Sequence, residues 1–490
     1  MSLDDGDCEP AVTRVNDDRG FVDLLFEMKL HDTTLSQEAT DDLAQKCIAK
    51  FDDADAALEC RAVSLYTVVA QIRAGNTSML AYVPDICRRL KSRSVLSQRL
   101  TDPGAEEFHL QIITAISVIL DTSPETFVDE AFGPVLHYLA QKVSCERTEV
   151  AAAACKFWAK HAGMSANLAI REHWMRLLLP EMSVLIKTLM DQMSYHPVHA
   201  EYLQHLGSTN TAERDKSLPV VETFANLRNF ATVAFEHVAR VYPADLVCTT
   251  FRPLLEERIE SDSWTEKEAA ILALATFTHG AGTPDAMLSS YALVVPRVVE
   301  CYSDPHPLLR SVACLTMPTL VGRQLHGVKT VLTLTARATR DSNAEVRMTA
   351  IRALSTLFAY RTPGAGTKRF GAHTARLVDA LERAGKCDMD CTTQCAYFEC
   401  VSHLVWRAGD SLTAAHMDRL IPPLIEAWRS QSCDSTVDGQ PGGSSVDPNL
   451  GIVPLSVSLG TVATYGKSLY EPFAECVFAK VCADIEGYNI

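Results

Sequence analysis

The stretches DPHPLLRSVACLTMPTL, from Asp304, and DSNAEVRMTAIRALSTL, from Asp341, share one pattern. Each begins with Asp, places Arg six residues later (Arg310 and Arg347) and continues in small and apolar residues. The two starts, at residues 304 and 341, lie 37 residues apart, within the range of repeats built from a pair of helices. A looser copy, SDSWTEKEAAILALATF, starts at Ser261. The pattern is typical of HEAT-type repeats.

The residue types at these positions suggest how one repeat meets the next. An aspartate at the turn can cap the second helix of a pair by accepting from its free backbone N–H groups. The arginine one turn into that helix can reach the aspartate of a neighbouring repeat. Small residues such as Ala313 and Ala350 let adjacent helices pack closely. We therefore expect a ladder of Asp and Arg side chains along a stack of helix pairs.

Helical periodicity extends over almost the whole chain. Segments of roughly 12 to 20 residues with apolar positions at i, i+3, i+4 and i+7 recur from about residue 20 to the end. Alternating, strand-like runs are almost absent. A single helix pair cannot bury its own apolar face, so several pairs must stack. The predicted fold class is all-α, an α-α superhelix of the HEAT-repeat solenoid type.

The domain organisation follows from the interruptions of this periodicity. Residues 1–20 are expected to form an acidic disordered tail, and residues 21–490 one HEAT-repeat solenoid. Residues 196–218 are polar and are predicted to be a loop. Residues 430–449 are rich in Ser, Gly and Pro and are predicted to be a flexible insertion within a repeat.

Composition narrows the class of function. The formal net charge is −16, which argues against nucleic acid as the main ligand and favours basic partners. No apolar run is long enough to span a membrane, so no membrane insertion is expected. The 16 cysteines are scattered and the N-terminus does not resemble a signal peptide. Reduced thiols in the cytosol or nucleus are the better interpretation.

Three short motifs suggest chemistry but lack the context that it needs. Gly409–Leu412 (GDSL) follows a helical stretch, where a nucleophilic serine would follow a buried strand. Gly364–Lys368 (GAGTK) lacks the full spacing of a phosphate-binding loop. No catalytic residues and no cofactor are predicted, and the protein is not expected to be an enzyme.

The third motif is a cluster of cysteines, namely Cys387, Cys391, Cys395 and Cys400, with His403 beyond it. Spacings of four place the first three on one helical face, whereas zinc sites usually draw close Cys pairs from turns. We interpret them as small buried hydrophobic residues and predict no metal site. A metal-dependent enzyme that uses this cluster is the alternative, and it requires stoichiometric zinc.

Several blocks of the sequence, taken in order, resemble the transportin family of nuclear import receptors in the importin-beta superfamily. The blocks are VAAAACKFW (150–158), NLRNFATVAFEHVARVYPADL (226–246), W-x-x-K-E-x-x-I-L (264–272), CYSDPHPLLRSVAC (301–314), DSNAEVRMTAIRALSTL (341–357), LIPPLIEAW (420–428) and PLSVSLGTVAT (454–464). Together they run from about residue 40 to about residue 485. Each block alone is weak, and their order and spacing carry the resemblance.

The resemblance implies a function and a set of partners. It implies a nuclear transport receptor that binds basic nuclear-localisation segments of cargo proteins on a concave surface, with Ran GTPase and FG nucleoporins as further partners. Such a protein shuttles between cytoplasm and nucleus. The alternative is a HEAT-repeat scaffold outside transport, for example in a phosphatase complex.

The resemblance also places cargo contacts at six positions, which are Glu236, Leu272, Val312, Leu315, Thr356 and Glu399. Glu236 and Glu399 match carboxylates that are expected to pair with basic cargo side chains. Leu272, Val312 and Thr356 match apolar or hydroxyl contacts.

The sequence departs from the family at several of these places. Leu315 stands where the family has a tryptophan, and a leucine offers less area and no stacking face. Thr319 replaces an arginine, and an acidic contact near Ala359 is lost. Residues 196–218 take the place of a long acidic loop that couples Ran to cargo release, and they are short and barely acidic. The match also begins several repeats into the family.

Overall fold

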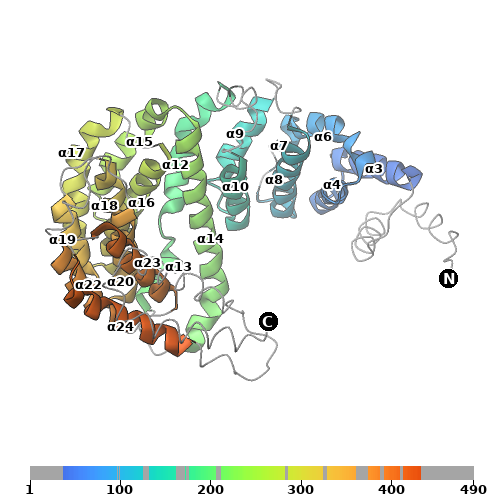
Figure 1. Ribbon diagram of the computed structural model, residues 1–490. Coiled ribbons are helices and arrows are strands. Elements are labelled where there is room, and N and C mark those ends of the chain that lie inside the picture. Colours follow the sequence, from blue (N-terminus) through green and yellow to red (C-terminus); the bar gives the residue numbers. More distant parts are fainter. Residues whose placement is uncertain are drawn as a thin grey trace, which may run out of the picture. The chain divides into compact units, whose positions relative to one another are not determined.

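All regular elements of the described structure are helices. The computed structural model describes residues 37–431 except 97, 99, 125–131, 162–171, 173–175, 206–210, 282–284, 324–327, 360–372, 387–390 and 409–411. Within these residues the secondary structure consists of α-helices and short 3-10 turns (Figure 1). The predicted all-α fold class is confirmed. No helix within the described ranges is long and apolar enough to cross a membrane.

The chain divides into two compact units, Met1–Leu254 and Leu255–Ile490, which we describe separately. The boundary falls inside α15 (Ala244–Ile259). The single solenoid over residues 21–490 remains a prediction, and the acidic tail at 1–20 lies outside the described residues.

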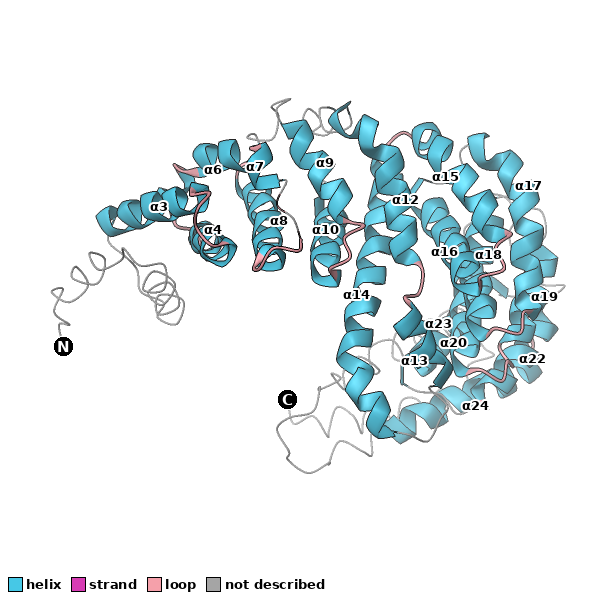
Figure 2. Cartoon of the chain, turned by 180° about the vertical axis from the view of Figure 1, so that it is seen from behind, coloured by secondary structure: helices cyan, strands magenta, loops and turns pink. Residues whose placement is uncertain are grey.

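Unit 1 consists of paired helices whose second members pack side by side. Its helices are α3 (Gln37–Asp52), α4 (Leu58–Arg73), α5 (Thr77–Leu80), α6 (Val83–Leu90), α7 (Arg93–Leu96), α8 (Ala105–Thr122), α9 (Gly133–Lys142), α10 (Thr148–His161), η3 (Leu179–Glu181), α12 (Met182–Met193), α13 (Pro197–His205) and α14 (Thr211–Val241). In one row α4 packs on α8, α8 on α10 and α10 on α14. Helices α9 and α12 cover this row from one side (Figure 2).

Unit 2 repeats this two-row arrangement. Its helices are α16 (Trp264–Ala281), α17 (Asp285–Glu300), η4 (Cys301–Ser303), α18 (Pro307–Arg323), α19 (Val328–Ala338), α20 (Ala344–Ala359), α22 (Thr374–Gly385), α23 (Cys391–Ala408) and α24 (Ala414–Gln431). Helices α16, α18, α20 and α23 pack in sequence and form what we call the first row. Helices α17, α19, α22 and α24 form the second row, in which α22 contacts both α19 and α24.

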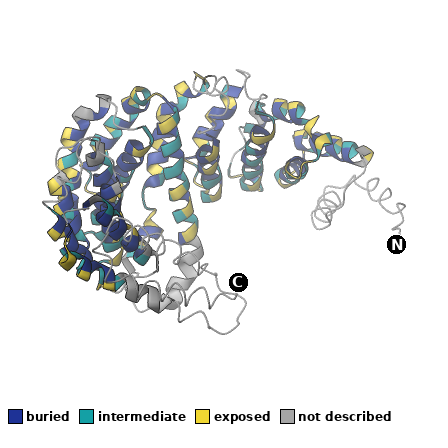
Figure 3. Cartoon of the chain, in the orientation of Figure 1, coloured by how far each residue is buried: buried dark blue, intermediate teal, exposed yellow. Residues whose placement is uncertain are grey.

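Helices of the first row are buried on most of their circumference (Figure 3). In α16 every residue from Glu268 to Thr278 is buried except Leu272, which is half-buried. Ala269, Ala270 and Ala273 have no exposed surface at all. A helix that packs against two neighbours in its row and a partner in the other row has to be apolar or small nearly all round. The small-residue run of the sequence meets that requirement.

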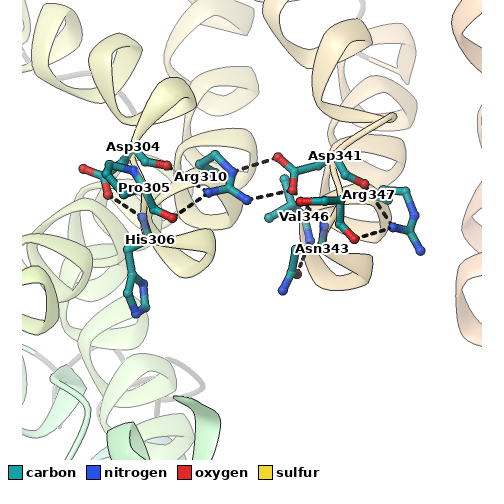
Figure 4. Close-up of polar contacts among 9 residues, drawn as sticks. Asp304, Pro305, His306, Arg310, Asp341, Asn343, Val346 and Arg347 are labelled. Carbon is teal, nitrogen blue, oxygen red and sulfur yellow. Dashed lines mark hydrogen bonds and ion pairs between the residues drawn. The ribbon is translucent and has the colours of Figure 1, made fainter. Parts of the chain in front are cut away.

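The predicted contact between an arginine and an aspartate of the next repeat is present (Figure 4). The guanidinium of Arg310 donates through Nε and Nη2 to the two carboxylate oxygens of Asp341, both at 2.7 Å. Its Nη1 donates to the carbonyls of Asp304 and Pro305 at 2.9 and 3.0 Å. Arg347 makes the same pair of carbonyl contacts one repeat later, to Asp341 and to the following serine, both at 3.0 Å.

The aspartates cap the turn and not the helix that follows, which corrects one detail of the expected pattern. The carboxylate of Asp304 accepts from the N–H of His306 at 2.8 Å, and that of Asp341 from the N–H of Asn343 at 2.9 Å. These are contacts two residues ahead, before each helix begins. In the second repeat the cap is Asn343, whose side-chain oxygen accepts from the N–H of Val346 at 3.3 Å.

The loop predicted at residues 196–218 is largely helical in the structure, so this prediction is wrong. Helix α13 starts at Pro197, and α14 already runs from Thr211. Proline is favoured at the first position of a helix, and the sequence TAERDKSL from Thr211 contains good helix formers and no glycine. The polar composition of residues 196–218 was therefore not sufficient to identify a loop, because polar residues with good helix propensity also form exposed helices. The insertion predicted at 430–449 falls almost entirely outside the described residues.

The described cysteines, except the half-buried Cys145, are buried and behave as small core residues. Burial raises the pKa of Cys47, Cys155 and Cys314 to about 12, so these thiols stay protonated at neutral pH. Cys400 is also buried. Cys387 and the side chains of Cys391 and Cys395 lie outside the described part of the chain. Among described residues no group of three or more His, Cys, Asp or Glu side chains is arranged to hold a metal ion.

We predict that Arg310→Ala destabilises unit 2 by about 2 to 3 kcal/mol, because it removes charge-assisted hydrogen bonds and leaves Asp341 without its main partner. Both side chains are largely shielded, with 15% and 14% of their surface exposed. Urea unfolding followed by circular dichroism measures the loss. Arg297→Ala is the matched control. Arg297 forms an exposed ion pair with Glu260, so its loss should lower the free energy of unfolding by less than the loss of Arg310. Equal losses in the two variants would contradict the assignment.

The same pair predicts a dependence of stability on pH. Burial by itself would raise the pKa of Asp341, but hydrogen bonds from Arg310 and from the N–H of Asn343 together lower it below its ordinary value. Its stabilisation is therefore complete above the pKa of an unfolded aspartate, about 4, and is lost as pH falls through the lower folded value. Urea midpoints measured from pH 6 down to pH 3 should fall less steeply in Asp341→Asn than in the parent chain. If the urea midpoints of the two proteins fall in parallel with pH, the ionised Asp341 carboxylate does not contribute to this pH dependence.

Candidate functional site

The six positions that the resemblance singles out lie on the helices whose small residues pack side by side. Glu236 is on α14 in unit 1. The other five lie in the first row of unit 2, with Leu272 on α16, Val312 and Leu315 on α18, Thr356 on α20 and Glu399 on α23. Because these four helices pack in sequence, the five positions occupy adjacent helices of one layer.

Leu315 is the most exposed of the apolar positions. Its side chain is 45% exposed, although its neighbours Cys314 and Thr316 are buried. Thr316 also ties α18 to the preceding helix, because its hydroxyl donates to the carbonyl of Ile271 at 3.3 Å. The backbone that carries Leu315 is thus fixed by contacts beneath it. An apolar side chain held in water at the middle of a rigid helix offers a contact point for an apolar partner group.

Val312 and Leu272 have less exposed side-chain surface than Leu315. Val312 is only 4% exposed and its side chain packs into the core. A side chain without surface cannot contact a partner directly, so Val312 supports the helix from beneath. Leu272 is half-buried and keeps part of its side chain in solvent.

Exposed polar side chains follow on the next two helices. Thr356 is exposed, and its hydroxyl donates to the carbonyl of Arg352 one turn earlier, at 3.0 Å. Arg352 is itself exposed, and the sequence comparison did not single it out. Glu399 is exposed on α23 between the buried Phe398 and Cys400, and it forms no ion pair with the described residues. Helices α20 and α23 therefore present a basic group at Arg352 and an acidic group at Glu399.

Glu236 stands in a different setting. It is half-buried and forms an ion pair with Arg240 one turn later on α14. A basic partner that binds Glu236 would have to share this carboxylate with Arg240. Unit 1 contains Glu236 and unit 2 the other five positions, so each is considered within its own unit.

The positions that depart from the family are occupied in ordinary ways. The hydroxyl of Thr319 donates to the carbonyl of Thr316 at 2.7 Å and is thereby engaged within its own helix. The side chain of Ala359 lies outside the described part of the chain.

Buried hydroxyl and imidazole groups link adjacent helices of the rows. Ser355 on α20 lies 2.8 Å from Nδ1 of His403 on α23, and Ser311 on α18 lies 2.9 Å from the hydroxyl of Thr349 on α20. A serine beside a histidine is a pairing used in nucleophilic catalysis. Ser355, however, is buried between two packed helices, where no substrate carbonyl can reach it. These contacts satisfy buried polar groups and fix neighbouring helices in register.

The comparisons with known proteins agree with this architecture. No protein-family model matches the chain. Over 394 residues the chain is 23% identical to Transportin-1 of Mus musculus, and this alignment covers 71% of the chain and 40% of the mouse protein. It is 25% identical over 265 residues to Transportin-1 of Homo sapiens, covering 52% of this chain and 26% of the human protein.

Solved structures of a karyopherin share the fold. Kap121p bound to the SUMO protease Ulp1p superposes with a TM-score of 0.62 and 12% identity, over 97% of this chain and 43% of that one. Kap121p bound to Nup53p gives a TM-score of 0.62 and 12% identity, over 98% of this chain and 44% of that one. The chain thus spans less than half the length of these relatives. The chain thus shares the helical fold of these karyopherin structures, and its sequence is similar to part of the transportin sequences.

Proposed function

We propose that the chain belongs to a nuclear transport receptor and binds basic nuclear-localisation segments of cargo proteins on the first row of unit 2. The similarity to Transportin-1 over 71% of the chain carries the proposal.

The chemistry of the row supports this class of ligand. Glu399 can accept charge-assisted hydrogen bonds from a lysine or arginine of the cargo. Leu315 on α18 supplies an apolar contact two helices away from Glu399 in the same layer, and Thr356 lies on α20 between them. The formal charge of −16 attracts basic segments from a distance and speeds their encounter. Binding is therefore expected to weaken as salt concentration rises.

Further partners and the location of the protein form part of the same proposal. A receptor of this kind binds FG nucleoporins and shuttles between cytoplasm and nucleus, and Ran GTPase releases its cargo. One of the structural neighbours was solved with Nup53p bound. Assignment of these partners to this chain rests on its resemblance to the transportin family.

We predict that Glu399→Lys raises the Kd for a fluorescent basic nuclear-localisation peptide by roughly tenfold or more, because it replaces an attractive carboxylate with a like charge. Fluorescence anisotropy at low salt measures binding. Asp418→Lys is the matched control, since Asp418 is an exposed acid on α24 in the second row. The control should leave the Kd unchanged.

Leu315→Trp tests the apolar contact in the opposite direction. A tryptophan restores the larger face that the family has at this position, so the peptide should bind more tightly than to the parent chain. The cargo assignment fails if the parent chain does not bind the peptide at low salt, or if Glu399→Lys and Asp418→Lys have the same effect.

A further inference from the structure

A hollow with basic sides lies in the second row of unit 2, on other helices than the proposed cargo contacts. Its volume is about 320 Å³, and its lining comes from α19, α22 and the residues that flank them. The two helices are in contact with each other (Figure 1). Its floor is apolar and consists of the buried side chains of Leu332, Ala336 and Leu377. The volume is at the lower end of the range of ligand pockets, about 300 to 1,000 Å³.

Three arginines surround this floor. Arg337 and Arg340 come from the C-terminal end of α19 and the turn after it, and Arg376 from the first turn of α22. All three are exposed, and none forms an ion pair with a carboxylate of the described residues. Three unneutralised guanidinium groups around one hollow stand out in a chain whose formal charge is −16.

The acidic side chains beside the hollow are engaged elsewhere. Asp341, which follows Arg340 directly, accepts from Arg310 with both carboxylate oxygens and also from the N–H of Asn343. Asp379 lines the hollow but forms an ion pair with Arg419, which also holds Glu382 at 2.6 Å. The fold therefore leaves the positive charge of the arginines uncompensated by these neighbours.

The start of α22 adds to the positive potential. Its first turn has no acidic residue, and His373, which precedes the helix and lines the hollow, provides no side-chain cap. The first N–H groups of a helix have no intrahelical acceptor and carry partial positive charge. This effect reinforces the arginines, which are the main feature of the site.

We propose that this hollow is a docking site for an acidic linear segment of a partner protein. An apolar side chain of the segment fills the space above Leu332 and Leu377, and carboxylates on either side of it accept from the arginines. The apolar floor favours a peptide over a bare inorganic anion. The acidic charge of the whole chain repels a long nucleic acid more strongly than a short acidic peptide. The proposal does not depend on cargo binding, because it concerns the other row.

Binding of a labelled peptide to the full chain tests the proposal. The probe is a short fluorescein-labelled peptide with one phenylalanine flanked on both sides by glutamates. The control peptide has glutamine in place of every glutamate. The glutamate peptide should bind in a salt-dependent manner and at least roughly tenfold more tightly than the glutamine peptide. Arg337→Glu combined with Arg376→Glu should raise its Kd by roughly tenfold or more.

Matched variants separate a local effect from a change of overall charge or fold. Arg73→Glu makes the same substitution at an exposed arginine at the end of α4 in unit 1, and it should leave the Kd unchanged. If the double glutamate variant unfolds at a lower temperature than the parent, Arg337→Gln with Arg376→Gln replaces it in the same assay. Glu399→Lys should not weaken binding of the glutamate peptide, and this result distinguishes the hollow from the proposed cargo surface.

Three outcomes overturn the proposal. The glutamine peptide binds as tightly as the glutamate peptide, which would indicate a purely apolar site. A single-stranded oligonucleotide binds more tightly than the glutamate peptide, and the same double variant weakens its binding. The double variant binds the glutamate peptide as the parent chain does.

Discussion

The packing of each first-row helix between two similar neighbours is the constraint from which the rest of the structure follows. Such a helix has no wide polar face, because three of its sides contact other helices. In α16 this requires alanines without exposed surface at Ala269, Ala270 and Ala273, where a larger side chain would force the neighbours apart. Every additional helix pair is stabilised by the pair before it, so the stack extends by contacts between nearest neighbours.

Polar groups inside this packing act between repeats. Arg310 binds the carboxylate of Asp341 with two of its nitrogens and two carbonyls of its own turn with a third. Ser355 with His403 and Ser311 with Thr349 link the same layer from within. A hydrogen bond that is satisfied only when two helices are in the correct register penalises slippage, since the alternative is a buried group without a partner.

What remains exposed after such packing is narrow, and this determines where the protein can bind others. On the first row of unit 2 the free strip includes Leu315, Thr356 and Glu399, which suits a ligand with apolar and basic groups. On the second row three arginines surround an apolar floor, which suits the opposite charge. The two rows of one unit thus offer different chemistry, although the net charge of −16 describes only the average.

The sequence by itself determined the helical repeats, the contact from Arg310 to the next repeat and the burial of Cys400. These depend on local spacing and residue size, which the order of residues states directly. Only the tertiary structure decided that Val312 is buried while Leu315 is exposed, that residues 197–205 and 211–218 are helical, and that Arg337, Arg340 and Arg376 surround one hollow. Burial and charge pairing depend on which neighbours engage each side chain, and helices from different repeats supply those neighbours.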